Sequence, residues 1–579
     1  MSLINEITNN FKKYKLEKSN ESMEKFCIPK KYALQPQQLF LSELLISKYS
    51  PWNNNNNIRG ILLYHNIGSG KTCTSIRIAE QFKKKLNIII ILPASLIGNY
   101  LLELRSGCTS IKNSKTFKEG YTQHEYISDN EINKLKKLNY QDSEYLNIID
   151  KINDRISKYY TIYSYNKFIL LIKEEKIINL NNTLLIIDEV QNMISMDGTY
   201  YNLLKKVIDK SDKTLKIVLL SATPIFDKPI EIALTLNLLK TDDLFSINDF
   251  NQDFMKINNN NYKIINKNMF NNKIKNLISY YRGAPPQTYP KFKMKTVKCN
   301  MSNFQYKSYL TTMSKDNKYL KSSFKSLNIL KMSQSFFLGP RMISNIAFPN
   351  KLTGIEGYKS LKGDVLMIKN ICKYSIKFYK IIQKINHSEG PVFIYSNFKD
   401  IGGIKSFIKF LEYHKWKNYV NYNEGNKRFA IWSGDESFEL KEKIKSIYND
   451  KRNENGNLIK IILGSPSIKE GISLFRVCQV HILEPYWNMS RILQIMGRAI
   501  RYCSHKDVPI KRRFVEVYIY LATYPNIKTI DKYIWSLAKK KNKLIQEFEL
   551  LLKQSSIDCK LFYNRNNYDT DEVQLKCSN

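Results

Sequence analysis

The sequence is poor in glycine and proline, and its cysteines form no recognisable pair. It has 21 glycines and 16 prolines in 579 residues. The nine cysteines are spread between Cys27 and Cys577, with no CxxC pair and no His/Cys cluster at zinc spacing. This odd, dispersed set predicts reduced thiols in a cytosol-like compartment and argues against a disulfide framework.

Long apolar runs are also missing. The longest, residues 86–98, is interrupted by two polar residues and a proline. It falls well short of the roughly 20 apolar residues that a membrane-spanning helix needs. We therefore expect no transmembrane segment, no signal peptide and a cytoplasmic location.

Positive charge, in contrast, is in large excess. The chain has 91 Lys and Arg against 52 Asp and Glu, which gives a formal net charge of +39. Such a balance predicts a polyanionic partner, because neutralising phosphates releases their counterions. Nucleic acid is the first interpretation and an anionic membrane surface the second. With 43% hydrophobic residues the chain can bury several cores, so wholesale disorder is excluded.

Short aliphatic runs predict two series of parallel strands with helices on both faces. The first series is residues 62–64, 87–92, 184–187 and 217–220, and the second is 392–395, 429–432, 459–463, 480–483 and 515–521. The predicted class is α/β, with two parallel-sheet lobes. We divide the chain into an N-terminal extension (1–30), a first lobe (31–240), a connector with a helical insertion (241–390), a second lobe (391–528) and a helical tail (529–579).

A glycine-rich segment, residues 65–72, follows the first strand and precedes a helical stretch. Its glycines let backbone amides close around phosphate oxygens, a lysine reaches the β- and γ-phosphates, and a threonine hydroxyl can ligate Mg²⁺. His65 stands where a small residue is usual, so the turn into the loop is expected to differ. The alternative is a glycine-rich turn without a ligand. We assign nucleotide binding, with ATP and Mg²⁺, to Gly68, Ser69, Gly70, Lys71 and Thr72.

Two adjacent carboxylates, Asp188 and Glu189, follow the aliphatic strand at 184–187. We expect Asp188 to hold Mg²⁺ through water, beside Thr72, and Glu189 to orient and deprotonate the attacking water. A solvated acidic pair at a strand end is the alternative. The phosphate-binding loop roughly 120 residues upstream favours the catalytic interpretation.

These motifs resemble those of superfamily 2 helicases and translocases. The DEVQ sequence at 188–191 is similar to motif II of that family, and the Ser-Ala-Thr sequence at 221–223 to motif III. The resemblance implies two RecA-like lobes that hydrolyse ATP, with Gln191 in the catalytic set. It also implies that Ser221, Ala222 and Thr223 couple the nucleotide to the other lobe. Gln191 stands where most such relatives carry His, so this coupling is expected to be tuned differently.

Further segments resemble the adenine-recognition and strand-binding motifs of the same family. The segment 34–38 is similar to the adenine-recognition segment of DNA translocases, which makes Gln38 the expected adenine contact. Segments 92–99, 163–165 and 465–472 are similar to motifs that grip the nucleic-acid backbone. The residues carried over as backbone contacts are Pro93, Ser95, Asn99, Ser164, Lys469 and Gly471.

The sequence QIMGRAIR at 494–501 is similar to motif VI. A γ-phosphate that loses its bond needs a guanidinium delivered by a facing domain. We assign this arginine-finger role to Arg501, with Arg498 organising the site beside it and Gln494 in the coupling set. A basic, solvated helix face is the alternative.

Residues 484–488, 501–505 and 556–559 narrow the resemblance to one branch of large cytoplasmic DNA viruses and linear plasmids. That branch holds poxvirus nucleoside triphosphatase I, the small subunit of the poxvirus early transcription factor and helicase-like proteins of yeast cytoplasmic linear plasmids. It implies a nucleic-acid-stimulated ATPase of cytoplasmic transcription, with DNA favoured over RNA and a viral or plasmid RNA polymerase or transcription factor as partner. If the source is a virus, we expect the protein in the virion too. The alternative is a promoter-recognition or polymerase-bridging subunit that uses ATP as a conformational switch.

Overall fold

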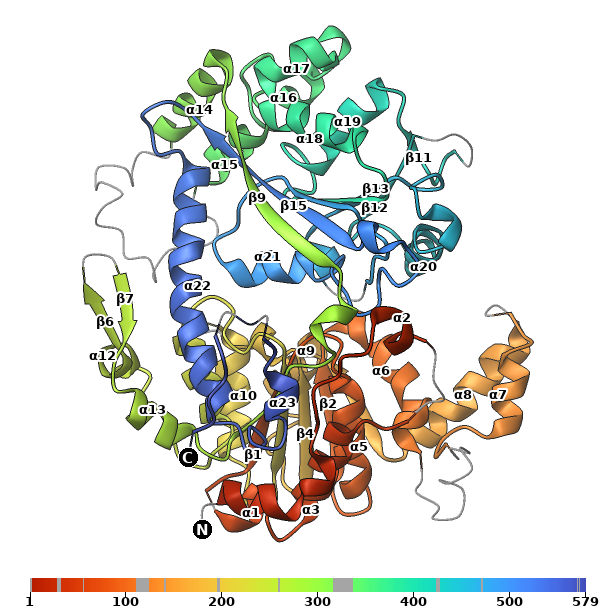
Figure 1. Cartoon of the computed structure of the whole chain (residues 1–579), viewed down its shortest axis with the longest axis vertical. Coiled ribbons are helices and arrows are strands. Elements are labelled where there is room, and N and C mark those ends of the chain that lie inside the picture. The colour runs from red at the N-terminus through yellow and green to blue at the C-terminus, as the bar shows by residue number, and fades with distance from the viewer. Residues whose placement is uncertain are drawn as a thin grey trace. The chain divides into compact units, whose positions relative to one another are not determined.

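The structure, a computed structural model, places most of the chain in two compact units. It describes residues 3–28, 33–55, 57–110, 124–139, 142–194, 198–258, 261–315, 337–422, 427–469, 472–569, 571 and 573–578. The first unit contains residues 1–21, 28–286 and 543–579, and the second contains residues 22–27 and 287–542. Each is an α/β lobe built on a parallel sheet (Figure 1), which confirms the predicted pair of RecA-like lobes.

The first unit is built on a six-stranded sheet in the order β3-β2-β4-β5-β1-β8. All five pairings are parallel, so the carboxyl ends of the strands meet at one edge. The strands are β1 (Gly60–His65), β2 (Asn87–Leu92), β3 (Tyr160–Ser164), β4 (Thr183–Asp188), β5 (Lys216–Ser221) and β8 (Ile278–Tyr281). Strand β8 comes from the segment predicted as connector. It is short and fully buried beside β1, and its tyrosines hid it from an aliphatic pattern.

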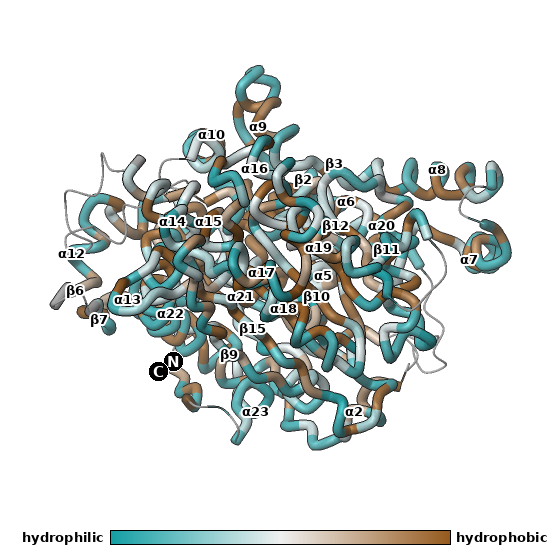
Figure 2. The backbone as a smooth tube through the Cα atoms, turned by 90° about the horizontal axis from the view of Figure 1, so that it is seen from above, coloured by the Kyte–Doolittle hydropathy of each residue, from teal (hydrophilic) through white to brown (hydrophobic). Residues whose placement is uncertain are grey.

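Helices cover this sheet and extend beyond it. They are α1 (Leu3–Asn10), α3 (Pro36–Ile46), α4 (Pro51–Asn54), α5 (Lys71–Phe82), α6 (Ile97–Leu104), α7 (Asp129–Leu135), α8 (Ser143–Ser157), α9 (Tyr165–Lys173), α10 (Thr199–Asp209), α11 (Ile230–Asn237), α12 (Phe250–Phe254) and α13 (Lys267–Ile274). A two-stranded antiparallel hairpin, β6 (Met255–Asn258) and β7 (Asn261–Ile264), lies between α12 and α13. Figures 1 and 2 both show α7 and α8 at the outer margin of this unit.

The second unit is built on a seven-stranded parallel sheet in the order β11-β12-β13-β10-β14-β15-β9. The strands are β9 (Lys291–Asn300), β10 (Val392–Tyr395), β11 (Lys417–Asn418), β12 (Arg428–Trp432), β13 (Ile461–Gly464), β14 (Gln479–Ile482) and β15 (Phe514–Thr523). Edge strand β9 also comes from the predicted connector. Its alternating lysines and exposed position leave eight of its ten residues exposed, which is why no aliphatic run marked it.

Helices of the second unit pack on both faces of this sheet. They are α2 (Met23–Phe26), α14 (Asn303–Lys315), α15 (Leu338–Asn345), α16 (Gly354–Ser360), α17 (Ile368–Tyr374), α18 (Ile376–Asn386), α19 (Ile404–Tyr413), α20 (Phe438–Tyr448) and α21 (Met489–Met496). Neighbouring residues of one strand alternate between two cores: Val517 and Ile519 belong to one cluster, Tyr518 and Tyr520 to the other. This alternation explains why the strands read as continuous apolar runs.

The predicted helical tail consists of α22 (Ile530–Gln554) and α23 (Tyr563–Asn566). The residues of α22 up to Asn542 belong to the second unit and those from Lys543 to the first. In the first unit Phe548 of α22 packs against Phe250 and Phe270, with ring centroids 5.9 and 5.3 Å apart. From Lys543 onward the tail is therefore part of the first unit and contributes Phe548 to its packing.

The expectation of reduced thiols is wrong for six of the nine cysteines. Disulfides join Cys27 to Cys503, Cys73 to Cys108 and Cys559 to Cys577, with Cα atoms 5.8, 5.3 and 5.7 Å apart. The partners are 476, 35 and 18 residues apart in the chain, so only the fold brings them together. Within the described segments, none of the helices combines the length and hydropathy that crossing a bilayer requires.

Candidate active site

The phosphate-binding loop lies at the carboxyl edge of the first sheet, between His65 at the end of β1 and Lys71 at the start of α5. Gly68 and Gly70 adopt left-handed backbone conformations, with φ of 79° and 78°. The left-handed conformation of Gly70 favours glycine, and a Cβ there would lie 2.7 Å from the Gln38 amide and displace it. The loop delivers the amino end of a 12-residue helix, where backbone amides favour an anion.

Two neighbouring glutamines of α3 hold the loop from one side. The Gln37 side chain donates to the carbonyl of Ser69 at 3.2 Å, and the Gln38 side chain to the carbonyl of Gly70 at 3.4 Å. Gln38 Oε1 also accepts from the backbone N–H of Gln35 at 2.8 Å. Both ends of the Gln38 amide are thus engaged within the protein, and its contact with adenine stays a prediction. Sequence reasoning missed Gln37, although it adjoins Gln38.

Asp188 is the last residue of β4, and Glu189 follows it beside the phosphate-binding loop. Glu189 Oε1 lies 3.9 Å from Lys71 Nζ. Burial, and then the charge of Glu189, raise the pKa of Asp188 to about 7, whereas the charge of Lys71 opposes this shift. A buried carboxyl of this kind, near a second carboxylate, fits a divalent cation that would favour its charged form. Thr72 is in the first turn of α5.

The donor set also fits a phosphate chain. Ser69 Oγ in the middle of the loop is buried and has no hydrogen-bond partner among the described residues. An unpartnered buried hydroxyl costs free energy unless a ligand satisfies it. Together with the loop amides and Lys71, it makes the donor set expected for the phosphates of ATP with Mg²⁺.

Glu189 is held in an unusual backbone conformation. Its φ and ψ are 53° and 46°, in the left-handed region that residues other than glycine rarely occupy. The hydroxyl of Tyr165 donates to the carbonyl oxygens of Asp188 and Glu189, the second at 2.9 Å. Tyr165 therefore fixes the turn that carries both carboxylates. Tyr165 belongs to the segment 163–165 that resembles a strand-binding motif, but the sequence alone does not reveal this role.

A short hydrogen-bonded chain connects Glu189 to β5. Gln191 Nε2 donates to Glu189 Oε2 at 2.6 Å, and Ser221 Oγ donates to Gln191 Oε1 at 2.6 Å. The backbone N–H of Thr223 in turn donates to Ser221 Oγ at 3.0 Å. Ser221 and Thr223, which flank Ala222, are predicted to couple the nucleotide to the other lobe. The structure connects both to Glu189, the carboxylate predicted as the base.

The residues predicted to grip nucleic acid in the first unit lie at the same sheet edge. Pro93 follows β2, while Ser95 and Asn99 are exposed on the turn and helix after it. Ser164 ends β3, and its hydroxyl caps α9 by accepting from the N–H of Lys167 at 3.3 Å. Their contact with nucleic acid stays a prediction, and Ser164 also has this structural role.

The predicted residues of the second unit gather around the end of α21. Arg501 Nε donates to the carbonyl of Gly497 at 3.0 Å and its Nη1 to Ser473 Oγ at 2.7 Å. Burial, and then the charge of Arg498, lower the pKa of Arg501 to about 9. Gln494 lies within α21. Gly471 and the side chain of Lys469 lie outside the described residues.

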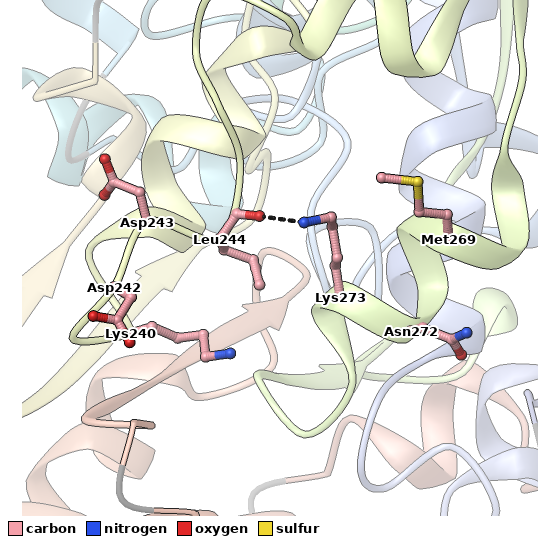
Figure 3. A pocket seen from close by; sticks show the side chains of 7 residues that line it. All are labelled: Lys240, Asp242, Asp243, Leu244, Met269, Asn272 and Lys273. Carbon is pink, nitrogen blue, oxygen red and sulfur yellow. Dashed lines mark hydrogen bonds between the residues drawn. The ribbon is translucent and has the colours of Figure 1, made fainter.

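A separate hollow of about 660 Å³ is found in the first unit, lined by Lys240, Asp242, Asp243, Leu244, Met269, Asn272 and Lys273. Figure 3 shows Lys273 donating to the carbonyl of Leu244, at 2.9 Å, across its middle. The backbone N–H groups of Arg59 and Gly60 bond to Leu239, which places this hollow near the amino end of β1. It is therefore at the sheet edge opposite the phosphate-binding loop, and none of the predicted site residues lines it.

Comparison with known proteins agrees with this geometry. Residues 46–346 match the SNF2-related domain, and residues 376–503 match the helicase conserved C-terminal domain. A protein of Acanthamoeba polyphaga mimivirus named as an ATP-dependent RNA helicase is 47% identical over 578 residues, covering 99% of this chain and 96% of the relative. A helicase of Invertebrate iridescent virus 3 is 28% identical (92% and 54% covered), and a termination factor NPH-I homolog of African swine fever virus is 25% identical (87% and 76%). The chain therefore belongs to the SNF2-related, ATP-hydrolysing helicases of superfamily 2.

Proposed function

We propose that the first unit binds ATP with Mg²⁺ and that hydrolysis drives movement of the protein along nucleic acid. One connected set of side chains carries this proposal. Lys71 forms an ion pair with Glu189, Glu189 is hydrogen-bonded to Gln191, and Gln191 is hydrogen-bonded to Ser221. It links a phosphate-binding lysine to a strand end through the side chain placed to act as base. Occupation of the site can thereby change the position of residues 221–223.

Each site residue has a distinct task in this proposal. The loop amides and Lys71 bind the β- and γ-phosphates, while Thr72 and Asp188 hold Mg²⁺, which neutralises phosphate charge when bound. Glu189 orients the attacking water and accepts its proton. Arg501 of the second unit stabilises the charge that develops in the transition state, with Arg498 organising the site beside it.

Nucleic acid is the proposed track. The net charge of +39 favours a polyanion, and Ser95 and Asn99 are exposed at the sheet edge that carries the nucleotide residues. Such contacts give affinity and position without reading sequence. We propose DNA rather than RNA, although the mimivirus relative is named as an RNA helicase, so both must be compared.

We further propose that the protein acts in cytoplasmic transcription, with a viral or plasmid RNA polymerase or transcription factor as its partner. Support comes from the African swine fever virus relative, which is named as a termination factor homolog. The viral origin of the relatives also supports the presence of the protein in a virion.

A chiefly bridging role, with ATP as a conformational switch, is the second candidate. It is favoured by α7 and α8, an insertion between β2 and β3 at the outer margin of the unit, where Leu146 is 52% exposed. We propose this outlying insertion as the part of the unit that would carry such a contact.

ATP turnover distinguishes the two candidates. Wild-type protein is assayed alone, with single-stranded and duplex DNA, and with RNA, and Lys71→Ala serves as the control without phosphate binding. A motor requires stimulation by one of these nucleic acids and loss of turnover in Lys71→Ala. Unstimulated, slow turnover together with nucleotide-dependent binding to a polymerase would favour the bridging role.

A further inference from the structure

A buried polar chain lies directly behind the phosphate-binding loop. His65 Nε2 lies 2.9 Å from Ser279 Oγ of β8, and Ser279 Oγ donates to Asp558 Oδ2 of the C-terminal tail. The backbone N–H of Tyr280 donates to Asp558 Oδ1 at 2.9 Å. All three side chains are fully shielded from solvent. This series of hydrogen bonds begins at His65, the first residue of the loop motif, and passes through Ser279 of the neighbouring strand. It ends at Asp558, almost 500 positions later in the sequence.

The direction of these hydrogen bonds follows from the chemistry of the three groups. A carboxylate only accepts, so the single hydroxyl proton of Ser279 is donated to Asp558. Ser279 Oγ must then accept from His65, which places the imidazole proton on Nε2. Burial, and then the charge of Lys71, lower the pKa of His65 to about 3, so the ring is neutral. Burial and Lys71 thus keep the ring neutral, whereas the hydrogen bonds to Ser279 and Asp558 decide which ring nitrogen carries the proton.

Other contacts fix the tail in the place where Asp558 can act. The backbone N–H of Ile557 donates to the carbonyl of Ile278, the first residue of β8, at 2.8 Å. Phe562 packs edge-on against Tyr281 and against Phe40 of α3, with centroids 5.7 and 5.6 Å apart. The Cys559–Cys577 disulfide closes the segment that follows Asp558. Backbone pairing, aromatic packing and a covalent link therefore all hold the carboxylate against β8.

The residues after β8 connect the tail to the loop by a second route. Arg282 forms an ion pair with Asp571, and its backbone N–H donates to Asn566 Oδ1 at 2.9 Å. The next residue, Gly283, has a φ of 96°, and a Cβ built on it would contact Ser69 at 3.5 Å. The end of β8 also bonds directly to the loop, because the backbone N–H of Asn66 donates to the carbonyl of Tyr281 at 3.1 Å. The segment that begins at Tyr281 thus contacts the loop and, through Arg282, the tail.

We propose that Asp558 is a positioning residue of the nucleotide site, acting through Ser279 and His65 to hold the phosphate-binding loop in its ligand-binding conformation. This inference rests on the proposed assignment of the loop to ATP. A loop fixed beforehand loses little conformational entropy when the phosphates bind, whereas a loose loop must be ordered by the ligand. Asp558 is fully buried behind the loop and therefore acts on affinity and geometry through Ser279 and His65.

The main test compares two isosteric changes in the full-length protein. Asp558→Asn reverses the chain: an amide N–H would donate to Ser279, whose proton must turn to His65 and displace the proton from its Nε2. The matched control is Asp569→Asn in the same tail, because the Asp569 side chain is 94% exposed and pairs only with the exposed Lys18 among the described residues. Ser279→Ala breaks the chain in its middle, and Ser279→Thr restores the hydroxyl.

The measurements separate positioning from simple loss of stability. We expect Asp558→Asn and Ser279→Ala to raise the Kd of a fluorescent ATP analogue and the KM for ATP by about tenfold or more, with nucleic-acid affinity unchanged. Asp569→Asn and Ser279→Thr should stay near wild type. Variants are isolated as folded monodisperse protein, and kcat is divided by the fraction of active sites. His65→Leu against His65→Gln, which keeps a donor, provides a second comparison if Ser279→Ala does not fold.

Several outcomes would overturn the inference. An unchanged Kd and KM in folded Asp558→Asn would do so, as would a loss explained entirely by a smaller active fraction, or an equal loss in Asp569→Asn. Lys71→Ala is measured alongside. If Lys71→Ala binds and hydrolyses ATP normally, the nucleotide-site assignment itself fails; if it is inactive while Asp558→Asn is normal, only the role of Asp558 fails.

Discussion

Ser221 Oγ donates a 2.6 Å hydrogen bond to Gln191 Oε1, and the same glutamine donates to Glu189. The side chain placed to act as base is therefore two hydrogen bonds from the end of β5. A His at position 191 would offer one donor and one acceptor on a rigid ring, whereas glutamine spans the same two partners with a flexible amide. The hydrogen-bonded connection from Glu189 to residues 221–223 is thus present with glutamine at position 191.

Ser221→Ala should uncouple hydrolysis from nucleic acid. It removes the bond to Gln191 but leaves Lys71, Asp188 and Glu189 in place, so basal turnover should stay within about threefold of wild type. Stimulation by nucleic acid should fall to nearly none. Steady-state ATPase assays with and without nucleic acid measure both, with Ser157→Ala as an exposed control of the same chemical change. Full stimulation of Ser221→Ala would remove the proposed coupling role.

Glu189→Gln should trap ATP. The amide keeps the shape of the side chain and can still bond to Gln191, but it cannot accept the proton of the attacking water. Nucleotide should therefore bind with affinity close to wild type, while single-turnover hydrolysis falls by about 10³-fold. Rapid hydrolysis by this variant would show that another group is the base.

Arg501→Ala should lower turnover by about 10³-fold or more and leave ground-state ATP affinity within a few-fold. The guanidinium is held by Gly497 and Ser473, which fixes it at the end of α21 ready to serve a transition state. Arg452→Ala, an arginine whose side chain is 80% exposed, is the control. If Arg501→Ala hydrolyses ATP at the wild-type rate, Arg501 is not the arginine finger and Arg498 becomes the next candidate.

His481 should make the second unit sensitive to acid. Burial, and then the charge of Lys384, lower its pKa to about 3, below the ordinary 6.5, while Tyr520 and Gln479 hold the neutral ring. The unfolded chain thus binds more protons below pH 6.5, and the stability contributed by this residue is full above that pH and is lost as pH falls. When the pH falls from 6.5 to 5, the free energy of unfolding of wild type should drop by about 2 kcal/mol more than that of His481→Gln. Urea unfolding at both pH values tests this, with the exposed His387→Gln as control.

Reductant should weaken the first unit. The disulfide between Cys73, in the first turn of α5, and Cys108 closes a 35-residue separation, for which chain entropy predicts about 3–4 kcal/mol. Adding dithiothreitol should lower the unfolding midpoint of wild type. The midpoint of Cys73→Ser, which already lacks this disulfide, should fall less. Equal shifts in the two proteins would assign the effect to the other disulfides.

The sequence was sufficient for the elements that obey local rules. Buried parallel strands read as apolar runs, and the loop at 65–72 has the glycines that its left-handed positions require. Strands β8 and β9 were not predicted, because neither has an aliphatic run. Tyrosines occupy half of β8, and lysines alternate along the first half of β9.

The parts of the site that were missed depend on contacts between distant segments. Gln37 and Tyr165 act through hydrogen bonds to backbone carbonyls of distant segments, which no local pattern reveals. The three disulfides likewise require the fold, because their spacing resembles no known framework.

The composition of the first unit has a consequence for how the protein is made. Residues 1–21, 28–286 and 543–579 form one lobe, with the whole of the other lobe encoded between them. During synthesis the strands of the first sheet leave the ribosome early, but Phe548 and Asp558 follow only after the second lobe has emerged. The nucleotide lobe is therefore completed last, and a nascent chain should be unable to bind ATP tightly until its final segment is released.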